Sequence, residues 1–468
     1  MTGGARPAPT HGPRQPVLLA TRRESEVTHM NQRRQMPVMA ALAAALLVFT
    51  SACTKADETK TAPPSPNVKT KAGTGKYAWT QFGPGSTVLV RSVAKGGCPD
   101  AHVDGATVKS EVFAHPTQNF PMTTCQAEIA PTAKSVTIDG VAVPPPPKQL
   151  EKVIVVGDIG CYMQGKDFQA CLDPSQFPAA ALARQIEAAK PDLVVFVGDI
   201  YYSQTECPPE KAAECGGVPT GDNWESWAYD FFDPYSPALS AAPWIFTRGN
   251  HESCDTKNDN GGPGWFQVLA PANIPCSNNT DPYRVDIAGQ SFIVFDSAIA
   301  DDNPAKASQV PDYAENFKKV HELAAGHPNT WFVDHRPLWA AAESKKGPYA
   351  LNQTLQDAIK SSGNTLPADV SLILSGHMHS LAYYTFADGR PAQIVSGGGS
   401  AILDKHTGDF AQQTIDGVTF AGAEITAQFG YVQLHRIDDR ANWQLEFVTK
   451  GGSVWKQCRL AGSKLDCA

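Results

Sequence analysis

Short apolar runs alternate with polar clusters through the middle of the chain. Five of these runs are rich in Val, Ile, Leu, Phe or Trp, and each is followed at once by a polar cluster. Such a pattern is typical of a buried strand that carries polar side chains to the edge of a sheet. The clusters are GDIG, GDIYY, GNHE, DHRP and GHMH, which begin at Gly157, Gly198, Gly249, Asp334 and Gly376. We therefore expect Asp, Tyr, Asn and His side chains to gather at strand ends.

Helical periodicity appears between the strands. Residues 177–190 form an amphipathic pattern with Pro178 placed for the first turn, and residues 313–325 and 349–361 predict two further helices. Beyond residue 392 the pattern returns to β. The predicted fold is α/β (α+β), with two packed mixed β-sheets flanked by helices in an αββα sandwich. The Trp- and Cys-rich stretch 203–242 is expected to be a long loop that covers part of the molecule.

The chain divides into four predicted parts. Residues 1–53 form an extension with an export signal, and residues 54–76, rich in Lys, Thr, Pro and Ala, form a flexible linker. Residues 77–147 show short β-prone runs without helical periodicity and predict a small all-β, sandwich-like domain that ends in four prolines. Residues 148–468 form the remaining domain, which carries all five polar clusters.

The export signal is expected between Met30 and Cys53. Arg33 and Arg34 precede an apolar stretch from 38 to 49, which is too short to span a bilayer comfortably. The residues before Cys53 resemble a bacterial lipobox, which predicts lipid anchoring of Cys53 and a periplasmic or cell-surface lipoprotein. An ordinary secretory signal is the alternative.

The net charge of the chain narrows its possible partners. The formal net charge is −8, so the chain as a whole does not attract polyanions, and we expect no nucleic-acid partner.

Of the 11 cysteines, ten remain when Cys53 is set aside, and an even number in an exported chain predicts disulfides. Sequence alone leaves their connectivity open. The simplest pairing joins neighbours: Cys98 with Cys125, Cys161 with Cys171, Cys207 with Cys215, Cys254 with Cys276, and Cys458 with Cys467.

The five polar clusters offer oxygen and nitrogen ligands but no thiolate. Such a ligand set suits two hard or borderline metal ions. The five clusters, in this order, resemble the motifs of calcineurin-like metallophosphoesterases. Gly160 stands where most of that superfamily has a His, and Tyr202 follows Asp199 by three residues. Both details are similar to the purple acid phosphatase branch. Tyr201 is the alternative inward-facing tyrosine.

The resemblance implies two metal ions and a reaction. Asp158, Asp199, Tyr202 and His379 would hold Fe(III), and Asp199 would bridge to a divalent ion (Fe, Zn or Mn) held also by Asn250, His335 and His377. A metal-bound hydroxide would attack a phosphomonoester, as in acid phosphatases. His251 is the expected catalytic residue, and Asn250, His251 and Arg336 would contact substrate. Glu252 is interpreted as structural, and Arg248 as a phosphate contact or an ion-pair partner.

Two alternatives to this metal-dependent phosphoric ester hydrolase stay open. A phosphodiesterase or nucleotidase on the same scaffold could stack a base on Trp224, Trp227 or Trp265. A non-catalytic surface binding lipoprotein could keep the metals as structural elements. The expected partner in the main interpretation is a small-molecule phosphate ester.

Overall fold

The computed structural model describes residues 73, 75–255, 260–344, 347–363, 365–405, 408–438 and 441–467. The predicted export signal, Cys53 and nearly all of the predicted linker lie outside these residues. The described residues all belong to one compact unit. Within them, no helix combines the length and apolar character needed to cross a membrane.

The first sheet has eleven strands, and its centre is parallel. Its order is β28 (Lys464–Cys467), β27 (Val454–Ala461), β26 (Asn442–Thr449), β25 (Gly430–Arg436), β9 (Lys152–Val156), β12 (Leu193–Phe196), β13 (Trp244–Phe246), β1 (Tyr77–Phe82), β2 (Val88–Ala94), β6 (Thr123–Ile129) and β5 (Glu111–Ala114). Strands β9, β12, β13 and β1 run parallel, and antiparallel strands extend the sheet on both sides.

The second sheet has nine strands and is also mixed. Its path is β14 (Tyr283–Ile287), β15 (Gln290–Val294), β16 (Thr330–Val333), β19 (Val370–Ser375), β21 (Ala392–Ser396), β20 (Leu381–Phe386), β24 (Val418–Thr426) and β22 (Gly408–Asp409), with β23 (Thr414–Ile415) paired to β24. Strands β15, β16, β19 and β21 are parallel.

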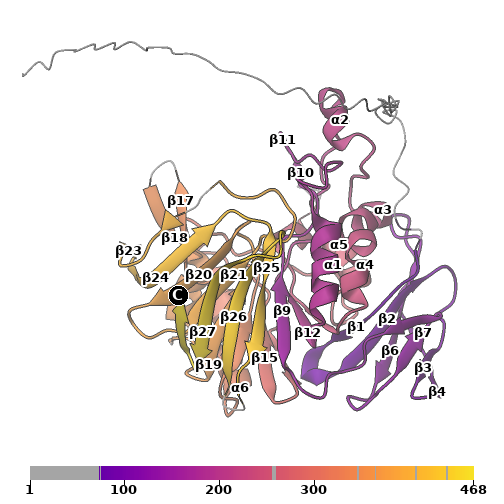
Figure 1. Ribbon diagram of the computed structural model, residues 1–468, viewed down its shortest axis with the longest axis horizontal. Helices are drawn as coiled ribbons and strands as arrows, with labels where there is room; N and C mark the ends of the chain where they lie inside the picture. The colour runs from indigo at the N-terminus through magenta and orange to yellow at the C-terminus, as the bar shows by residue number, and fades with distance from the viewer. Residues whose placement is uncertain are drawn as a thin grey trace, which may run out of the picture. The chain divides into compact units, whose positions relative to one another are not determined.

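Helices pack on the outer face of each sheet (Figure 1). On the first sheet lie α1 (Ala179–Ala189), α3 (Trp224–Trp227), a π-helical turn (Ala228–Phe232), α4 (Asp233–Leu239) and α5 (Gly262–Val268). On the second lie α6 (Val310–Ala324) and α7 (Gln353–Ser361). Smaller elements are β10 (Met163–Gln164), β11 (Asp167–Phe168), α2 (Ala212–Cys215), β17 (Ala340–Ser344) and β18 (Gly347–Leu351), with short 3₁₀ turns at Pro84–Ser86, Pro209–Lys211 and Asn250–Glu252.

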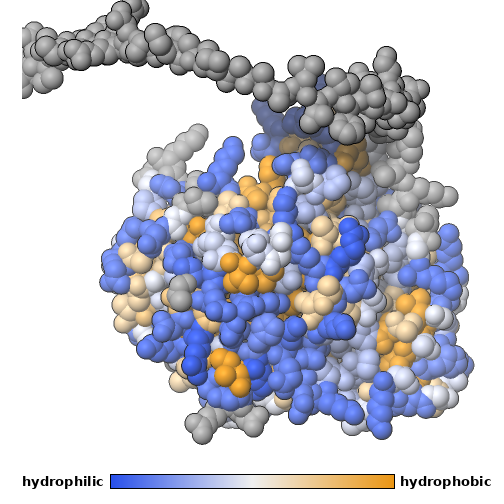
Figure 2. Space-filling model, in the orientation of Figure 1, coloured by the Kyte–Doolittle hydropathy of each residue, from blue (hydrophilic) through white to orange (hydrophobic). Residues whose placement is uncertain are grey.

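The continuous apolar runs are explained by burial on both faces of each sheet. In β9, Val153 and Val155 belong to the core between the two sheets, whereas Ile154 and Val156 belong to the core under the helices. Successive strand residues point to opposite faces, so a strand covered on both sides needs apolar residues at every position. The predicted αββα arrangement is confirmed. Figure 2 shows a largely hydrophilic surface with small, scattered apolar patches on the face in view.

The all-β character of residues 77–147 is also confirmed. These residues form β1 to β8, and β3 (Ala101–Val103), β4 (Ala106–Val108), β7 (Val136–Ile138) and β8 (Val141–Val143) make a separate four-stranded sheet. Strand β1, however, pairs with β13, so this region shares the first sheet with later strands of the chain. Arg91 also reaches across and donates to the Val268 carbonyl at 2.8 Å. The division into domains at residue 147 stays a prediction.

Local expectations had mixed outcomes. All five neighbour pairings of cysteines are present as disulfides. The helix expected from 349 begins only at Gln353, because residues 349–351 pair with β17 as part of β18. The stretch 203–242 is not a loop throughout, since α2, α3, the π-helical turn and α4 lie within it.

The core between the sheets depends on a pair of tryptophans. The rings of Trp331 in β16 and Trp443 in β26 meet edge to face with centroids 5.0 Å apart, and both side chains are buried.

We expect Trp331→Ala to lower the free energy of unfolding by about 3–5 kcal/mol, because it leaves a cavity between the sheets. Urea unfolding measures this change. Val454→Ala, at an exposed position, should change stability by less than about 0.5 kcal/mol; equal losses in both variants would contradict the role of the pair.

Candidate dinuclear metal centre

The polar clusters meet at one edge of the sandwich because they follow parallel strands. Asp158 follows β9, Asp199 follows β12, Asn250 follows β13, His335 follows β16 and His377 follows β19. The carboxyl ends of parallel strands lie at the same edge, where α/β proteins commonly bind ligands. Three of these residues have left-handed backbones, with φ of +58° at Asp158, +60° at Asp199 and +70° at His377. Such conformations are uncommon outside glycine and concentrate at functional sites.

Two neighbouring positions require glycine, because other side chains of the site approach their backbone closely. A Cβ atom on Gly249 would lie 2.0 Å from Asp199 Oδ1, and one on Gly198 would lie 2.4 Å from His335 Nδ1. Gly198 also has a φ of +99°. The glycines of the GDIYY and GNHE clusters therefore allow the loops from β12 and β13 to pack directly against the polar side chains.

The first group of side chains surrounds the phenol of Tyr202. Its oxygen lies 3.0 Å from Asp158 Oδ1, 3.0 Å from Asp199 Oδ2 and 2.9 Å from His379 Nε2. Tyr202 is fully buried. Tyr201, the alternative, stacks on Trp227 in the core under the helices, with centroids 6.4 Å apart. The structure therefore places Tyr202 among the predicted ligands and Tyr201 outside them.

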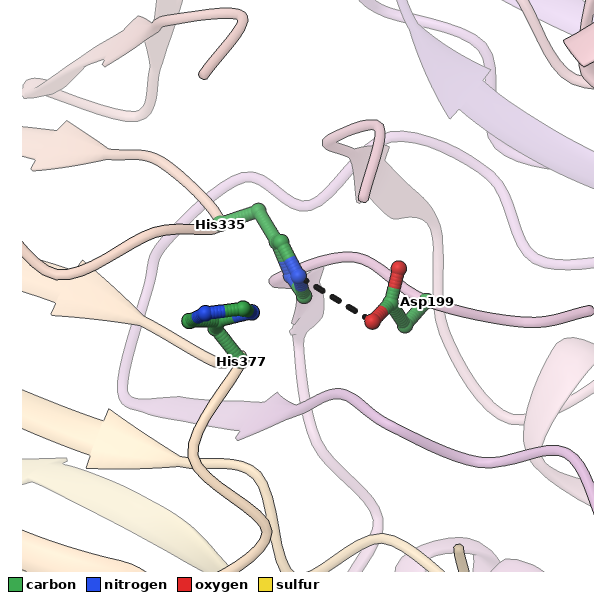
Figure 3. Close-up of side chains that lie close together, drawn as sticks. All are labelled: Asp199, His335 and His377. Carbon is green, nitrogen blue, oxygen red and sulfur yellow. Dashed lines mark ion pairs between the residues drawn. The ribbon is translucent and has the colours of Figure 1, made fainter. Parts of the chain in front are cut away.

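The second group includes His335 and His377, whose rings lie beside the Asp199 carboxylate in Figure 3. His335 Nε2 is 3.1 Å from Asp199 Oδ2 and 2.9 Å from Asn250 Oδ1, and the ring of His377 lies beside that of His335 at 5.1 Å between centroids. One donor atom each from Asp199, His335 and His377 fall within 4.8 Å of one another, and so do donor atoms of Asp158, Asp199 and His379. Asp199 is common to both sets, as expected of a carboxylate that bridges two ions.

Backbone carbonyls fix two of the imidazoles for metal binding. His335 Nδ1 is 2.8 Å from the Val197 oxygen, and His379 Nδ1 is 2.6 Å from the Ile402 oxygen. A carbonyl only accepts, so each Nδ1 carries the hydrogen. The lone pair of each Nε2 is then directed at the acidic groups, which is the orientation that a metal ligand needs.

The electrostatics of the site also suit cations. Burial, and then the neighbouring Asp199 carboxylate, raise the pKa of Asp158 well above its ordinary value. Burial and the charges of Asp158 and Asp199 raise the pKa of the Tyr202 phenol in the same way. Two buried carboxylates beside a phenol are stabilised in their charged forms when positive charge lies between them. The residues present therefore fit a pair of metal ions.

A buried carboxylate braces the loops that carry the ligands. Glu252 accepts the backbone N–H groups of Asp199, Ile200, Tyr201 and Gly249 at 2.8–3.2 Å. Asp230, from the π-helical turn, accepts the N–H groups of Cys161 and Tyr202 and the Ser203 hydroxyl. These contacts agree with the structural interpretation of Glu252 and give the positive-φ loops fixed hydrogen-bond partners.

The ring of His251 lies against that of Tyr202, with centroids 4.2 Å apart. The backbone N–H of His251 donates to Asp199 Oδ1 at 2.9 Å, and its Nδ1 is 3.1 Å from Gln204 Oε1. Gln204 is itself oriented, because its Nε2 donates to Asn260 Oδ1. Nδ1 of His251 therefore donates and Nε2 is left for other partners. Burial lowers the pKa of His251 to about 4.

Two residues near the ligands had no sequence-based prediction. Asp302 Oδ2 lies 2.9 Å from His377 Nε2 and accepts from Arg336 Nη1, which is itself 3.0 Å from that nitrogen. The only signal was the position of Asp302 in the loop after β15, another strand of the same parallel group. The ring of Tyr162 lies 5.5 Å from Tyr202 and 6.1 Å from His251 between centroids. No motif marked Tyr162.

Other predicted contacts lie elsewhere. Arg248 forms a buried ion pair with Asp296, so its guanidinium has the structural role that was one of its two interpretations. The idea that Trp224, Trp227 and Trp265 stack a nucleobase is wrong, because these side chains are 5%, 0% and 3% exposed and belong to the core under the helices.

Comparisons with known proteins agree with this geometry. The model of the calcineurin-like phosphoesterase family matches residues 151–381. No curated protein sequence matches the chain. Among solved structures, a purple acid phosphatase from yellow lupin (Lupinus luteus) seeds has 15% sequence identity and a TM-score of 0.55, covering 82% of this chain and 74% of that one. PhoD has 12% identity and a TM-score of 0.49, covering 86% and 93%. A dimetal phosphatase from Danio rerio has 10% identity and a TM-score of 0.37, covering 67% and 100%.

The matched segment contains all five polar clusters and every predicted ligand. At 15% identity, the likeness to the lupin enzyme extends to the fold. Residues 151–381 are therefore a calcineurin-like phosphoesterase domain, which supports a metal-dependent phosphoesterase with a dinuclear metal site, and the fold of the chain is like that of purple acid phosphatases.

Proposed function

We propose that the protein is an exported phosphatase of the purple acid phosphatase type that hydrolyses phosphomonoesters. The observation that carries the proposal is the position of Tyr202. Its phenol oxygen lies within 3.0 Å of two buried carboxylates and an imidazole nitrogen, where a metal ion would meet all four side chains. A phenolate is a hard, anionic ligand that suits a trivalent ion.

The two groups of side chains would hold different ions. Asp158, Asp199, Tyr202 and His379 would bind Fe(III), and Asn250, His335 and His377 would bind a divalent ion (Fe, Zn or Mn) that shares Asp199. The imidazoles and the amide oxygen suit the divalent ion. When bound, such a pair supplies activation of a water molecule and neutralisation of the phosphate oxygens.

The chain's own residues would position the substrate. Gln204 holds Nδ1 of His251, so Nε2 is the atom left for the substrate, and in the protonated ring it would donate to a phosphoryl or leaving-group oxygen. Arg336 provides positive charge next to His377, and its guanidinium is held there by Asp302. The loops that carry these residues are braced by Glu252, which limits reorganisation when a substrate binds.

Export to the periplasm or cell surface is part of the proposal. The basic and apolar stretch before Cys53 supports it, as do the five disulfides, because disulfides persist outside the reducing cytoplasm. Lipid attachment at Cys53 would tether the enzyme to a membrane surface, and mass spectrometry of the mature N-terminus checks it.

Removing the phenol oxygen tests the metal assignment. We expect purified wild-type protein to show a visible tyrosinate-to-Fe(III) absorption band, and Tyr202→Phe to lack it. The matched control is Tyr201→Phe, which removes the neighbouring hydroxyl and should keep the band. A colourless wild-type protein loaded with Zn or Mn would leave the phosphoesterase standing and refute the purple acid phosphatase type.

Asp199 is expected to control both ions. Asp199→Asn should lower the metal content measured by mass spectrometry from about two ions per chain to less than one, since the bridge belongs to both sites. His379→Ala should lose chiefly one ion, because His379 belongs to the first group alone. Asp281→Asn, at an exposed position, is the control. Similar losses in the Asp199 and His379 variants would contradict the bridging role.

His251 is the predicted catalytic residue. His251→Ala should lower kcat for a phosphomonoester about 100-fold while both metals stay bound, because a positioned acid–base or phosphate-contacting group is lost. Phosphate release from monoester and diester substrates is the measurement. His102→Ala, an exposed histidine in β3, should act like wild type. Faster turnover of diesters than monoesters would favour a phosphodiesterase instead.

A further inference from the structure

A cavity of about 710 Å³ adjoins the metal centre. Asn250, His251 and Arg336 form the side of it that lies nearest the metal ligands. The rest of its described lining is Gln164, Ser253, Cys254, Asp255, Asn260, Asn278, Ala298, Ile299, Asp301, Lys306 and Gln309. Its volume is typical of a site for a small molecule. A phosphate held at the metals would therefore place its leaving group in this space.

The lining is polar and, among the described residues, contains no Phe, Tyr or Trp; its one aromatic group is the imidazole of His251. Of the rings that contact His251, Tyr202 lies nearest, at 4.2 Å between centroids, and Tyr162 lies at 6.1 Å; neither is part of the lining. A nucleobase gains much of its binding energy from stacking on aromatic rings, and the described lining offers only the small imidazole of His251 for that contact.

Two amides in the lining are oriented by hydrogen bonds on their oxygen atoms. Gln164 Oε1 accepts from the Tyr162 hydroxyl at 2.8 Å, and Asn278 Oδ1 accepts from the Cys254 N–H at 2.7 Å. The NH₂ groups of both amides have no hydrogen-bond partner among the described residues. Each is therefore a fixed donor for an oxygen atom of a ligand.

The charges in the lining offset one another. Lys306 lies 3.4 Å from Asp301, and Arg336 is paired with Asp302. Together with Asp255, the part of the lining that the structure describes contains two cations and two carboxylates. A charged leaving group would gain little net attraction there. An uncharged group with several hydroxyls can donate to the carboxylates and accept from the amides and cations at once.

We propose that this cavity binds the leaving group of the substrate and that the group is a small, uncharged polyol, so that the enzyme acts on phosphomonoesters of sugars or similar alcohols. The inference rests on the proposed phosphatase function and names the substrate class of the same site. Gln164 and Asn278 are the specificity-determining residues.

Three substrates separate the contributions of chemistry and recognition. Glucose 6-phosphate and adenosine 5′-monophosphate both release a primary alcohol, so the ratio of their kcat/KM values reports recognition of the leaving group. 4-Nitrophenyl phosphate has a reactive leaving group without hydroxyls and reports the chemical step. With the metal-loaded enzyme, we expect kcat/KM for glucose 6-phosphate to exceed that for adenosine 5′-monophosphate at least about tenfold, the effect of 1.4 kcal/mol.

Two variants remove the donors without removing the metal site. Gln164→Met keeps the length of the side chain, and Asn278→Asp keeps the oxygen that accepts from Cys254. Each should lower kcat/KM for glucose 6-phosphate about three- to tenfold, the effect of one hydrogen bond, and leave 4-nitrophenyl phosphate within about twofold. Gln118→Met, an exposed glutamine outside the cavity, is the matched control and should change neither value.

The outcomes distinguish the two proposals. A preference for adenosine 5′-monophosphate, or equal losses for all three substrates in the variants, would overturn the polyol subsite while phosphate release upheld the phosphatase. No phosphate release from any of the three substrates would overturn the proposed function and the subsite with it.

Discussion

The carboxylate of Asp199 is the group on which the site depends. It is fully buried, lies 3.0 Å from the Tyr202 phenol and 3.1 Å from His335 Nε2, and accepts the backbone N–H of His251. Burying an anion among polar groups is costly unless positive charge and hydrogen bonds compensate. Side chains that follow strands of both sheets supply that compensation around Asp199. The site therefore forms only when the αββα sandwich holds its two sheets in a fixed relative position.

This requirement explains the unusual backbone at the strand ends. Asp158, Asp199 and His377 have positive φ angles, which an ordinary loop would relax. Glu252 opposes that relaxation by accepting four backbone N–H groups from the loops after β12 and β13. The Cys161–Cys171 and Cys254–Cys276 disulfides close the chain just beyond the GDIG and GNHE clusters. Strain at the ligands is thus supported by groups that do not contact substrate.

The predictable part of the structure is the part where pattern and geometry coincide. Strands buried on both faces need continuous apolar runs, so β9, β12, β13, β16 and β19 and the polar residues after them could be located from sequence. Short sequence separations likewise made the five disulfides the simplest pairing. The placement of Tyr202 rather than Tyr201 among the acidic groups was open, because two adjacent residues point to different sides and composition does not say which.

The unpredictable part depends on contacts between distant segments. Asp302 meets His377 and Arg336 across 75 and 34 residues, and no local pattern indicates such a pair. Residues 349–351 were expected to begin a helix, but they pair with the adjacent strand β17, so pairing in a hairpin overrides the helical pattern there. The tryptophans of 203–242 were expected in a covering loop, but they belong to the core under the helices. The prolines and glycines of this stretch interrupt the helical pattern, so the sequence did not indicate these helices.

Residues at strand ends and residues in loops would recognise different parts of a substrate. Groups at the strand ends would hold metals, and metals bind the phosphate that every substrate shares, so they cannot select among esters. The cavity beside them is lined by loop residues such as Asn278 and Lys306, which lie outside the parallel strands. Loops can change without disturbing the core, and binding specificity is therefore commonly found on them. If the proposed function holds, selectivity for the alcohol would be a property of the loops, which can vary while the metal centre and the sandwich stay the same.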